Sequence, residues 1–439
     1  CENSNPDIFI IMKPLIIILA LFLLSLGNLN AHLTQEDCVT QAEANYPLIK
    51  KFNLNEATAR IDLSDINRSW LPRISAYTQA TVQNVVPSFP SALKSALDQM
   101  GQEMRGLGKL QYKFGVDVSQ MIYDGGASKA RRDIIRTQKD LKRASLEVEM
   151  YAVRERVENL FFAILLCDEQ IAQNEITRTL LQSNVDRLRS MLSNGTAMQS
   201  DLDMVEAQLL TVDQHIIQAQ SAVKGYKEVL ALYIGEKPES IKLIWPEEDE
   251  MPLTNRSDRP ELRLFNLQLA ANEASDRLTN TTLLPKIGFF AQAYYGYPGI
   301  DYFQSMINRD LSFNLLAGVK VSWNIDSFYT RKNSSIKTRL NAANIASDRE
   351  LFMFNSNLLT ASQTEAIEGL RKVIKDDERI IALRANVRRA AESQLENGII
   401  DATALLTKIS DENLAQLTST YHKIQLLQEI YKLKYTLNQ

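Results

Sequence analysis

The chain carries two hydrophobic patterns, one typical of strands and one typical of long helices. In four segments, aromatic and β-branched residues alternate with polar ones: 72–86, 110–123, 285–298 and 312–325. We expect one strand in each, longer than the about 5 or 6 residues usual in soluble sheets. Such strands are long enough to cross a membrane at a tilt.

The rest of the pattern predicts helices with a repeat of 3.5 residues, as in Leu181, Val185, Leu188 and Leu192. Two long helices are expected over 127–193 and 329–396, and shorter ones over 34–68, 199–233, 258–281 and 401–436. A long helix then extends about 100 Å and most short ones about 50 Å, so two short helices end to end match one long helix. The repeat fits a coiled coil, and alternatively the core of an ordinary antiparallel bundle.

Landmarks along the chain recur in the same order. Leu71-Pro72 returns as Leu284-Pro285, and two further pairs return at one shared spacing: Gly115-Val116 as Gly318-Val319, and Asn194-Gly195 as Asn397-Gly398. We therefore predict two tandem halves, 32–234 and 258–439. Each has a helix, a strand hairpin (about 70–123 and 284–325), a long helix, a tip (194–198 and 397–400) and a return helix.

The segment between the halves, 235–257, is rich in Pro and acidic residues, and we interpret it as a solvated linker. At the tips, Gly195 and Gly398 are expected to adopt the left-handed conformation that ends a long helix.

The pattern of the N-terminal region predicts an export signal. Lys13 precedes the apolar run from Leu15 to Leu26, which is too short for a permanent membrane span. We expect residues 1–31 to be upstream residues and a signal peptide that starts at Met12, with a retained anchor as the alternative. A lipid-modified Cys1 is a second alternative, disfavoured because an export-like run follows it.

Composition and charge exclude several classes of protein. The chain is 45% apolar with a mean hydropathy of -0.20, which excludes a helical membrane protein with many spans. The net charge of -4, with both signs mixed along the chain, gives no reason to bind nucleic acid. The 16 Gly and 12 Pro are few for 439 residues, which favours long uninterrupted elements.

No residue pattern indicates catalysis or a cofactor. The three Cys and three His match no zinc, haem or redox spacing, so we expect no metal site. No catalytic triad or phosphate-binding loop occurs, so we expect neither an enzyme nor an energised pump. Whether Cys38 and Cys167 form a disulfide stays open.

The four strands require more than one copy of the chain if they lie in a membrane. Two hairpins leave two open edges, whose backbone groups cannot face hydrocarbon. Bacterial barrels have about 8 strands or more, so at least two copies must share one wall, and three copies give about 12 strands. The alternative is a soluble β-sandwich on a helical stalk.

Several of these landmarks resemble those of a known family. The segments stand in the same order as similar ones in TolC-type outer membrane factors: Leu33–Val39 with Asn45-Tyr46-Pro47, Trp70-Leu71-Pro72, Ile122–Gly126, Arg259-Pro260-Glu261-Leu262, and Leu284-Pro285. The resemblance covers residues 33–437. It implies a homotrimer in the bacterial outer membrane, with a 12-stranded transmembrane β-barrel and a periplasmic α-barrel of antiparallel coiled-coil helices.

The resemblance also implies a function and partners. Such a protein is the passive exit duct of a tripartite efflux or type I secretion system, whose tips meet a periplasmic adaptor (membrane fusion) protein connected to an inner-membrane transporter. The alternative is a periplasmic structural or adaptor coiled-coil protein with a soluble β domain. The cargo and the class of transporter stay open.

The resemblance assigns roles to residues at the tips. The adaptor-docking residues are Asn194, Gly195, Thr196, Asn397, Gly398 and Ile399. Family tips carry Gly followed six residues later by Asp, which Gly195 and Asp201 match, and this Asp faces the narrowing pore and helps to close it. The alternative for Asp201 is a solvated tip residue.

The second tip departs from the family pattern. Ala404 and Thr407 stand where acidic residues are expected, and Leu395 stands where a Tyr is found. Closure at this tip then depends on packing of Leu405 and Leu406, or on Asp401 with Arg388 and Arg389, which are near in sequence.

Overall fold

The computed structural model describes residues 32–101, 106–248 and 257–438. The expected signal peptide and residues 249–256 of the expected linker lie outside the described residues. The chain divides into two compact units. The sheet unit comprises Phe52–Ser145 and Arg263–Arg349, and the helical unit comprises the chain up to Lys51, Leu146–Leu262 and the chain from Glu350.

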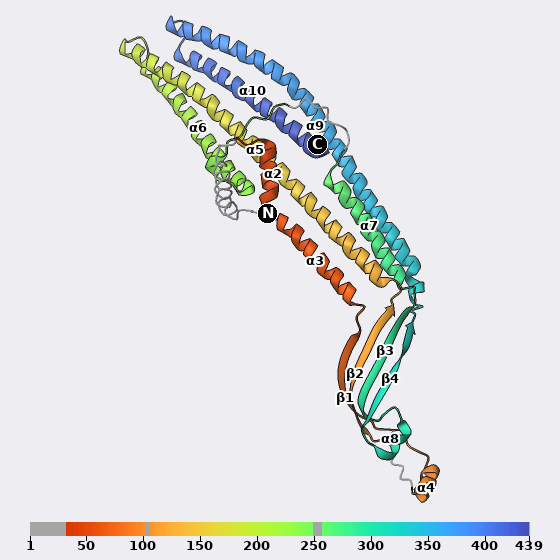
Figure 1. Cartoon of the computed structure of the whole chain (residues 1–439). Helices are drawn as coiled ribbons and strands as arrows, with labels where there is room; N and C mark the ends of the chain where they lie inside the picture. Colours follow the sequence, from red (N-terminus) through yellow and green to blue (C-terminus); the bar gives the residue numbers. More distant parts are fainter. Residues whose placement is uncertain (1–31, 102–105, 249–256, 439) are drawn as a thin grey trace, which may run out of the picture. The chain divides into compact units, whose positions relative to one another are not determined.

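The sheet unit contains a single four-stranded antiparallel sheet (Figure 1). Its strands are β1 (Arg73–Val82), β2 (Leu110–Tyr123), β3 (Lys286–Tyr297) and β4 (Ser312–Ser322), in the order β1-β2-β3-β4. They lie where the alternating pattern predicts them. Because each strand pairs only with its neighbours in the chain, β1 and β4 each leave one edge open.

Two short helices lie between the strands: α4 (Ser91–Gln99) follows β1, and α8 (Tyr302–Asn308) follows β3. The Asp301 side chain caps α8 by accepting a hydrogen bond of 2.9 Å from the Gln304 backbone N–H. Met306 of α8 packs with Tyr297 and Leu107 in a small core. Helices this short show too few turns to produce a clear period in the sequence.

The long helices lie within two residues of their predicted ends. They are α5 (Ala127–Ser193) and α9 (Ser327–Glu396), with return helices α6 (Gln199–Ile234) and α10 (Ala402–Leu437). The shorter α7 (Pro260–Thr281) precedes β3, and a 3-10 turn, η2 (Pro238–Ser240), follows α6.

The expected single helix over 34–68 is wrong. The structure has α2 (Gln35–Asn45) and α3 (Ile49–Arg68), separated at Tyr46 and Pro47. Tyr46 is extended, with φ -63° and ψ 131°, because the proline ring disfavours the helical conformation in the residue before it. The helical period continues across this break, so periodicity alone did not reveal it.

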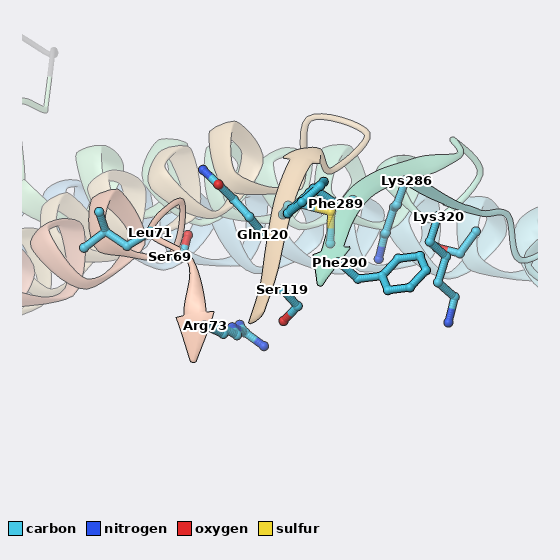
Figure 2. Close-up of a pocket in the computed structure, with 12 residues that line it drawn as sticks. Ser69, Leu71, Arg73, Ser119, Gln120, Lys286, Phe289, Phe290 and Lys320 are labelled. Carbon is cyan, nitrogen blue, oxygen red and sulfur yellow. The ribbon is translucent and has the colours of Figure 1, made fainter. Parts of the chain in front are cut away.

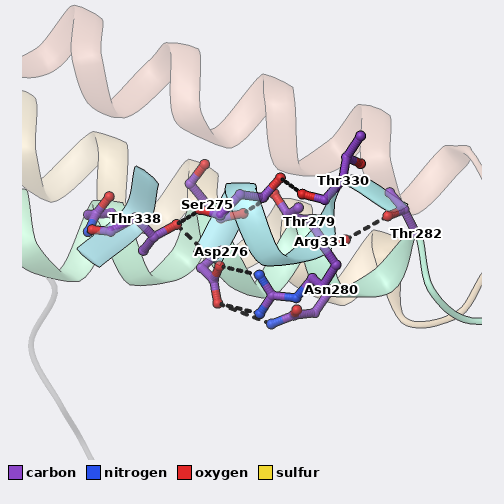
Figure 3. A network of polar contacts seen from close by, with 10 residues as sticks. Ser275, Asp276, Thr279, Asn280, Thr282, Thr330, Arg331 and Thr338 are labelled. Carbon is purple, nitrogen blue, oxygen red and sulfur yellow. Dashed lines mark hydrogen bonds and ion pairs between the residues drawn. The ribbon is translucent and has the colours of Figure 1, made fainter. Parts of the chain in front are cut away.

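Within the sheet unit, a polar network joins α7 to α9 (Figure 3). Asp276 of α7 forms an ion pair of 3.2 Å with Arg331 of α9 and accepts a hydrogen bond of 3.2 Å from the Thr338 hydroxyl. Asn280 donates to the same carboxylate at 3.1 Å. The network fixes the register of the two helices next to the sheet.

The helical unit is built around a buried cluster from several helices. Phe161 and Phe162 of α5 pack with Leu230 of α6, Cys38 of α2 and Ile424 of α10, all at most 1% exposed. Cys167 packs against this cluster, and the two cysteines are free, so the structure contains no Cys38–Cys167 disulfide.

Across the described ranges, every helix is either too short or too polar to cross a bilayer. In the same residues, His, Cys, Asp and Glu side chains nowhere gather in a group of three that suits a metal ion.

Candidate functional site

The two faces of the sheet differ sharply in polarity. The strand register places one set of side chains on a common face, and all but Thr78 and Gln120 are apolar. This apolar face comprises Ile74, Ala76, Thr78, Ala80, Val82, Leu110, Tyr112, Phe114, Val116, Val118, Gln120, Ile287, Phe289, Ala291, Ala293, Tyr295, Tyr297, Phe313, Leu315, Ala317, Val319 and Val321.

Much of this apolar face is uncovered in the single chain. Phe313 is 71% exposed, Leu315 and Val319 are each 64% exposed, and Phe114 is 63% exposed. An uncovered apolar face of this extent marks a surface that meets lipid or another protein. A soluble sandwich, which was the alternative from the sequence, requires a second layer over this face, and the described part of the sheet unit contains one sheet only.

The opposite, polar face carries hydroxyl, amide and charged groups. Gln292 on β3 donates hydrogen bonds to Asp117 on β2 at 2.9 Å and to the Tyr77 hydroxyl on β1 at 3.0 Å. This chain of bonds links three strands. Alternation of an apolar and a polar face along every strand is the pattern of a transmembrane barrel wall, with lipid on one side and water on the other.

The repeated glycines Gly115 and Gly318 have the same structural role in the two strand hairpins. Gly115 lies opposite Tyr77 and Gly318 lies opposite Phe290. A Cβ at either glycine would come within 3.0 Å of that partner's ring atoms. Each glycine therefore leaves room for an aromatic ring to lie on the polar face of the sheet.

The helical unit carries the second candidate site, the two tips. At Gly195, with φ 73°, the N–H donates to the Leu192 carbonyl at 3.0 Å, and the next N–H donates to the Met191 carbonyl at 2.9 Å. Gly398, with φ 66°, and Ile399 repeat both hydrogen bonds at the end of α9. Both are Schellman motifs, and the predicted left-handed caps are confirmed.

The two tips share one hydrophobic cluster drawn from all four helices. Leu188 of α5, Leu202 of α6, Leu395 of α9 and Leu405 of α10 belong to it and are at most 6% exposed. A hollow of about 470 Å³ lies between the tip segments, lined by residues that include Gly195, Asp201, Gly398 and Asp401. Four of the six adaptor-docking residues predicted from the resemblance line this hollow: Gly195, Thr196, Gly398 and Ile399.

Asp201 and Asp401 cap the return helices. Asp201 accepts a hydrogen bond of 3.0 Å from the Met198 N–H, and Asp401 accepts one of 2.8 Å from the Ala404 N–H. Each carboxylate lies at a helix N-terminus, where a negative charge is favoured.

The two arginines expected near Asp401 have other partners. Arg388 forms ion pairs with Glu392 on its own helix, at 2.6 Å, and with Glu412 on α10. Arg389 donates to the Asn386 side chain. Arg388 therefore joins α9 to α10.

One buried carboxyl was not identified from the sequence. Glu158 of α5 is 5% exposed, accepts a hydrogen bond of 2.8 Å from Gln35, and lies 3.2 Å from the Arg154 guanidinium. Burial raises the pKa of the Glu158 carboxyl to about 7, although Arg154 acts in the opposite direction. The sequence does not show that this Glu is buried, because it does not show which face of the helix packs against the other helices.

The first half of the chain matches a known family. Residues 39–236 match the family model described as "Outer membrane efflux protein". This part of the chain, somewhat less than half of its 439 residues, resembles the outer membrane efflux protein family. The match confirms the resemblance to TolC-type factors, and the proteins of this family are channels of the outer membrane.

Solved structures show the same fold over nearly the whole chain. The outer membrane protein VceC from Vibrio cholerae is 12% identical with a TM-score of 0.66, and the comparison covers 92% of this chain and 95% of VceC. The Campylobacter jejuni CmeC outer membrane channel is 13% identical with a TM-score of 0.67 over 92% and 85% of the two chains.

The open state of the Neisseria gonorrhoeae MtrE outer membrane channel is similar at 12% identity and a TM-score of 0.65, over 92% of this chain and 88% of MtrE. No curated protein matches the sequence. At these identities the structural matches establish the fold, namely long helices and a four-stranded antiparallel sheet.

Proposed function

We propose that this protein is the passive exit duct of a tripartite efflux or type I secretion system. Three copies form the duct, and the four strands of each copy contribute to a 12-stranded transmembrane β-barrel. The observation that carries the proposal is the sheet with one apolar face, one polar face and two open edges. Neighbouring copies satisfy the backbone groups of β1 and β4, which hydrocarbon cannot do.

Exposed apolar side chains at heptad spacing support the homotrimer. Val373, Ile380 and Val387 of α9 are seven residues apart and 40 to 45% exposed, while Leu210 and Ile217 of α6 are 63 and 61% exposed. Stripes with this period pack as coiled-coil seams. In the proposed trimer these stripes lie between chains, and the long helices form the wall of a periplasmic α-barrel.

The partners are a periplasmic adaptor protein at the tips and an inner-membrane transporter behind it, which supplies the energy. The tips suit docking because Met198 and Ile399 are 72 and 70% exposed beside the shared hollow. Asn194, Gly195, Thr196, Asn397, Gly398 and Ile399 provide the contact surface.

Closure of the periplasmic end depends on the same region. Leu405 holds the two tips together through the shared cluster, and Arg388 holds α9 to α10. Asp201, Asp401 and Arg389 are the charged groups available to rearrange when an adaptor docks.

The two halves, 32–234 and 258–439 with a linker at 235–257, are a tandem duplication. Two correspondences support this proposal: the identical Schellman motifs at Gly195 and Gly398, and the pairs Tyr77–Gly115 and Phe290–Gly318. Each half supplies one strand hairpin and one helical hairpin.

The decisive experiment is fractionation of cells that produce the full chain. We expect heat-resistant trimers that need detergent for extraction and occur in the outer-membrane fraction. A water-soluble monomer recovered from the periplasm would instead support the alternative, a soluble adaptor coiled coil, and would exclude the duct.

A further inference from the structure

All charged residues within the four strands lie on the polar face. The register places Arg73, Lys113, Asp117, Lys286 and Lys320 on this side, so four cations accompany one carboxylate. A polar wall needs no such excess of positive charge to remain hydrated, because the Ser, Asn and Gln side chains on the same face already bind water.

Three of the cations gather at one end of the sheet. Arg73, Lys286 and Lys320 line a hollow of about 300 Å³ together with Ser119 and Ser322. Figure 2 shows their side chains extending from the same side of the sheet, away from Leu71 and Gln120. Because Lys286 is paired with Ser322, Lys320 is its diagonal neighbour, at a Cα distance of roughly 7–8 Å.

The three cations have no acidic partner among the described residues, since no ion pair includes Arg73, Lys286 or Lys320. The one carboxylate on this face, Asp117, accepts a hydrogen bond from Gln292. Like charges on neighbouring strands destabilise a sheet. This arrangement therefore lowers the stability of the sheet and adds no stabilising contact.

An aromatic ring lies beside the cations. Phe290 points to the same side (Figure 2), and its ring lies over Gly318, where a Cβ would meet ring atoms at 3.0 Å. A flat apolar surface next to ammonium and guanidinium groups suits a molecule that has an aromatic body and a negatively charged group.

We propose that Arg73, Lys286, Lys320 and Phe290 form a basic belt on the water-facing wall, which selects anions and takes aromatic carboxylates and sulfonates as cargo. The inference rests on the proposed function, because the polar face lines a lumen only in a closed barrel. Every copy in the wall repeats the three cations, and rings of Lys and Arg are the usual devices of anion-selective pores.

The test uses the purified full-length protein in planar bilayers. Under a KCl gradient, we expect a reversal potential that shows chloride permeating better than potassium. The variant Arg73→Gln/Lys286→Gln/Lys320→Gln should lower the chloride-to-potassium permeability ratio several-fold. Lys113→Gln is the matched control: it lies on the same face, but its ammonium group rests 4.6 Å from the centre of the Tyr294 ring, so a smaller change is expected.

A second measurement does not require an open pore. Fluorescence anisotropy with pyrene tetrasulfonate should show binding to the detergent-solubilised protein that weakens with salt and falls several-fold in the triple variant. If the triple variant conducts with the permeability ratio of the wild type, or binds the dye equally well, the proposal of a basic belt is wrong. The proposed exit duct would not be affected by either result. A protein that neither forms trimers nor conducts would overturn both.

Discussion

The Tyr151 hydroxyl donates a hydrogen bond of 2.6 Å to the main-chain carbonyl oxygen of Tyr435, and the two rings stack with centroids 4.5 Å apart. This contact joins α5 to the last turns of α10. The Arg259 guanidinium lies 5.1 to 5.4 Å from the centres of the Tyr151, Tyr435 and Phe352 rings and forms an ion pair with Glu261. The start of α7 is thereby fixed to three other helices.

Replacing Arg259 should therefore loosen the helical unit. Arg259→Ala removes contacts to three rings and leaves the Glu261 side chain, 15% exposed, without its partner. Because the pair is partly buried, its loss should cost less than the about 3–5 kcal/mol of a fully buried pair. We expect a lower apparent midpoint of thermal unfolding in detergent, measured by circular dichroism. Arg259→Lys keeps the charge but loses the planar guanidinium group, so its midpoint should lie between those of the wild type and Arg259→Ala. Equal midpoints for the wild type and both variants would show that Arg259 does not stabilise the helical unit.

The buried carboxyl of Glu158 predicts a pH dependence of stability. Its folded pKa, about 7, is raised above the ordinary 4.5, so its contribution to stability is fully present below pH 4.5 and is lost as the pH rises through 7. The shift corresponds to about 3 kcal/mol. In the variant Glu158→Gln, this loss should disappear, so the variant should be more stable than the wild type at pH 8 and similar at pH 4.5.

Thermal midpoints measured from pH 4.5 to 8 check this expectation. Glu149→Gln is the matched control, since Glu149 lies at an exposed position of the same helix and should keep the wild-type pH profile. If Glu158→Gln also keeps that profile, the carboxyl is not responsible for the pH dependence.

The long elements and the tip glycines were predictable from the sequence because their signals are local. Helix period, strand alternation and the Asn-Gly pairs each depend on neighbours within a turn or two. The landmark Ile122–Gly126 has a similar local basis: Asp124 accepts hydrogen bonds from the Gly126 and Ser128 N–H groups at 3.0 and 2.6 Å and so begins α5.

The partners of the charged side chains were not predictable. Arg388 pairs with Glu412 from another helix, and not with the nearby Asp401, because the phase between α9 and α10 decides which side chains meet. The contacts of Arg259 with residues of α5, α9 and α10 depend on the same packing. Interactions between distant segments leave no trace in a single sequence.

The tip glycines allow a prediction with an internal control. Gly195→Ala and Gly398→Ala place a side chain in the left-handed conformation and should each cost about 1 kcal/mol or more. Gly225 and Gly369 lie inside α6 and α9, and a Cβ there meets no atom within 4 Å. Alanine at these helical positions should instead stabilise the protein by about 0.5–1 kcal/mol.

Hydrogen exchange of the Thr196 and Ile399 amides reports this difference, because both donate in the Schellman motifs. We expect faster exchange only in the two tip variants, together with weaker pull-down of the adaptor. Unchanged adaptor binding in both tip variants would remove the tips from the docking surface.

The heptad stripes predict variants that assemble poorly but fold normally. Ile217→Lys on α6 and Ile380→Lys on α9 place charges at positions that are 61 and 45% exposed in the single chain. The fold of the subunit should survive, whereas burial of an unpaired charge between copies should dissociate the trimer. Size-exclusion chromatography with light scattering measures the assembly. Gln214→Lys is the control at an exposed polar position of α6, and this variant should stay trimeric. Trimers from all three variants would show that the apolar stripes of α6 and α9 do not lie between copies of the chain.

Two adjacent leucines of β4 separate the two environments of the sheet. Leu315 lies on the apolar face opposite Ala293, and Leu316 lies on the polar face opposite Gln292. Leu315→Lys should cost about 2–4 kcal/mol because its ammonium group meets lipid, while Leu316→Lys meets water and should be tolerated. Heat-resistant trimers in the outer-membrane fraction should therefore be lost in the first variant only. Loss in both would show that lysine disturbs this strand on either side, and persistence in both would show that the apolar face does not meet hydrocarbon.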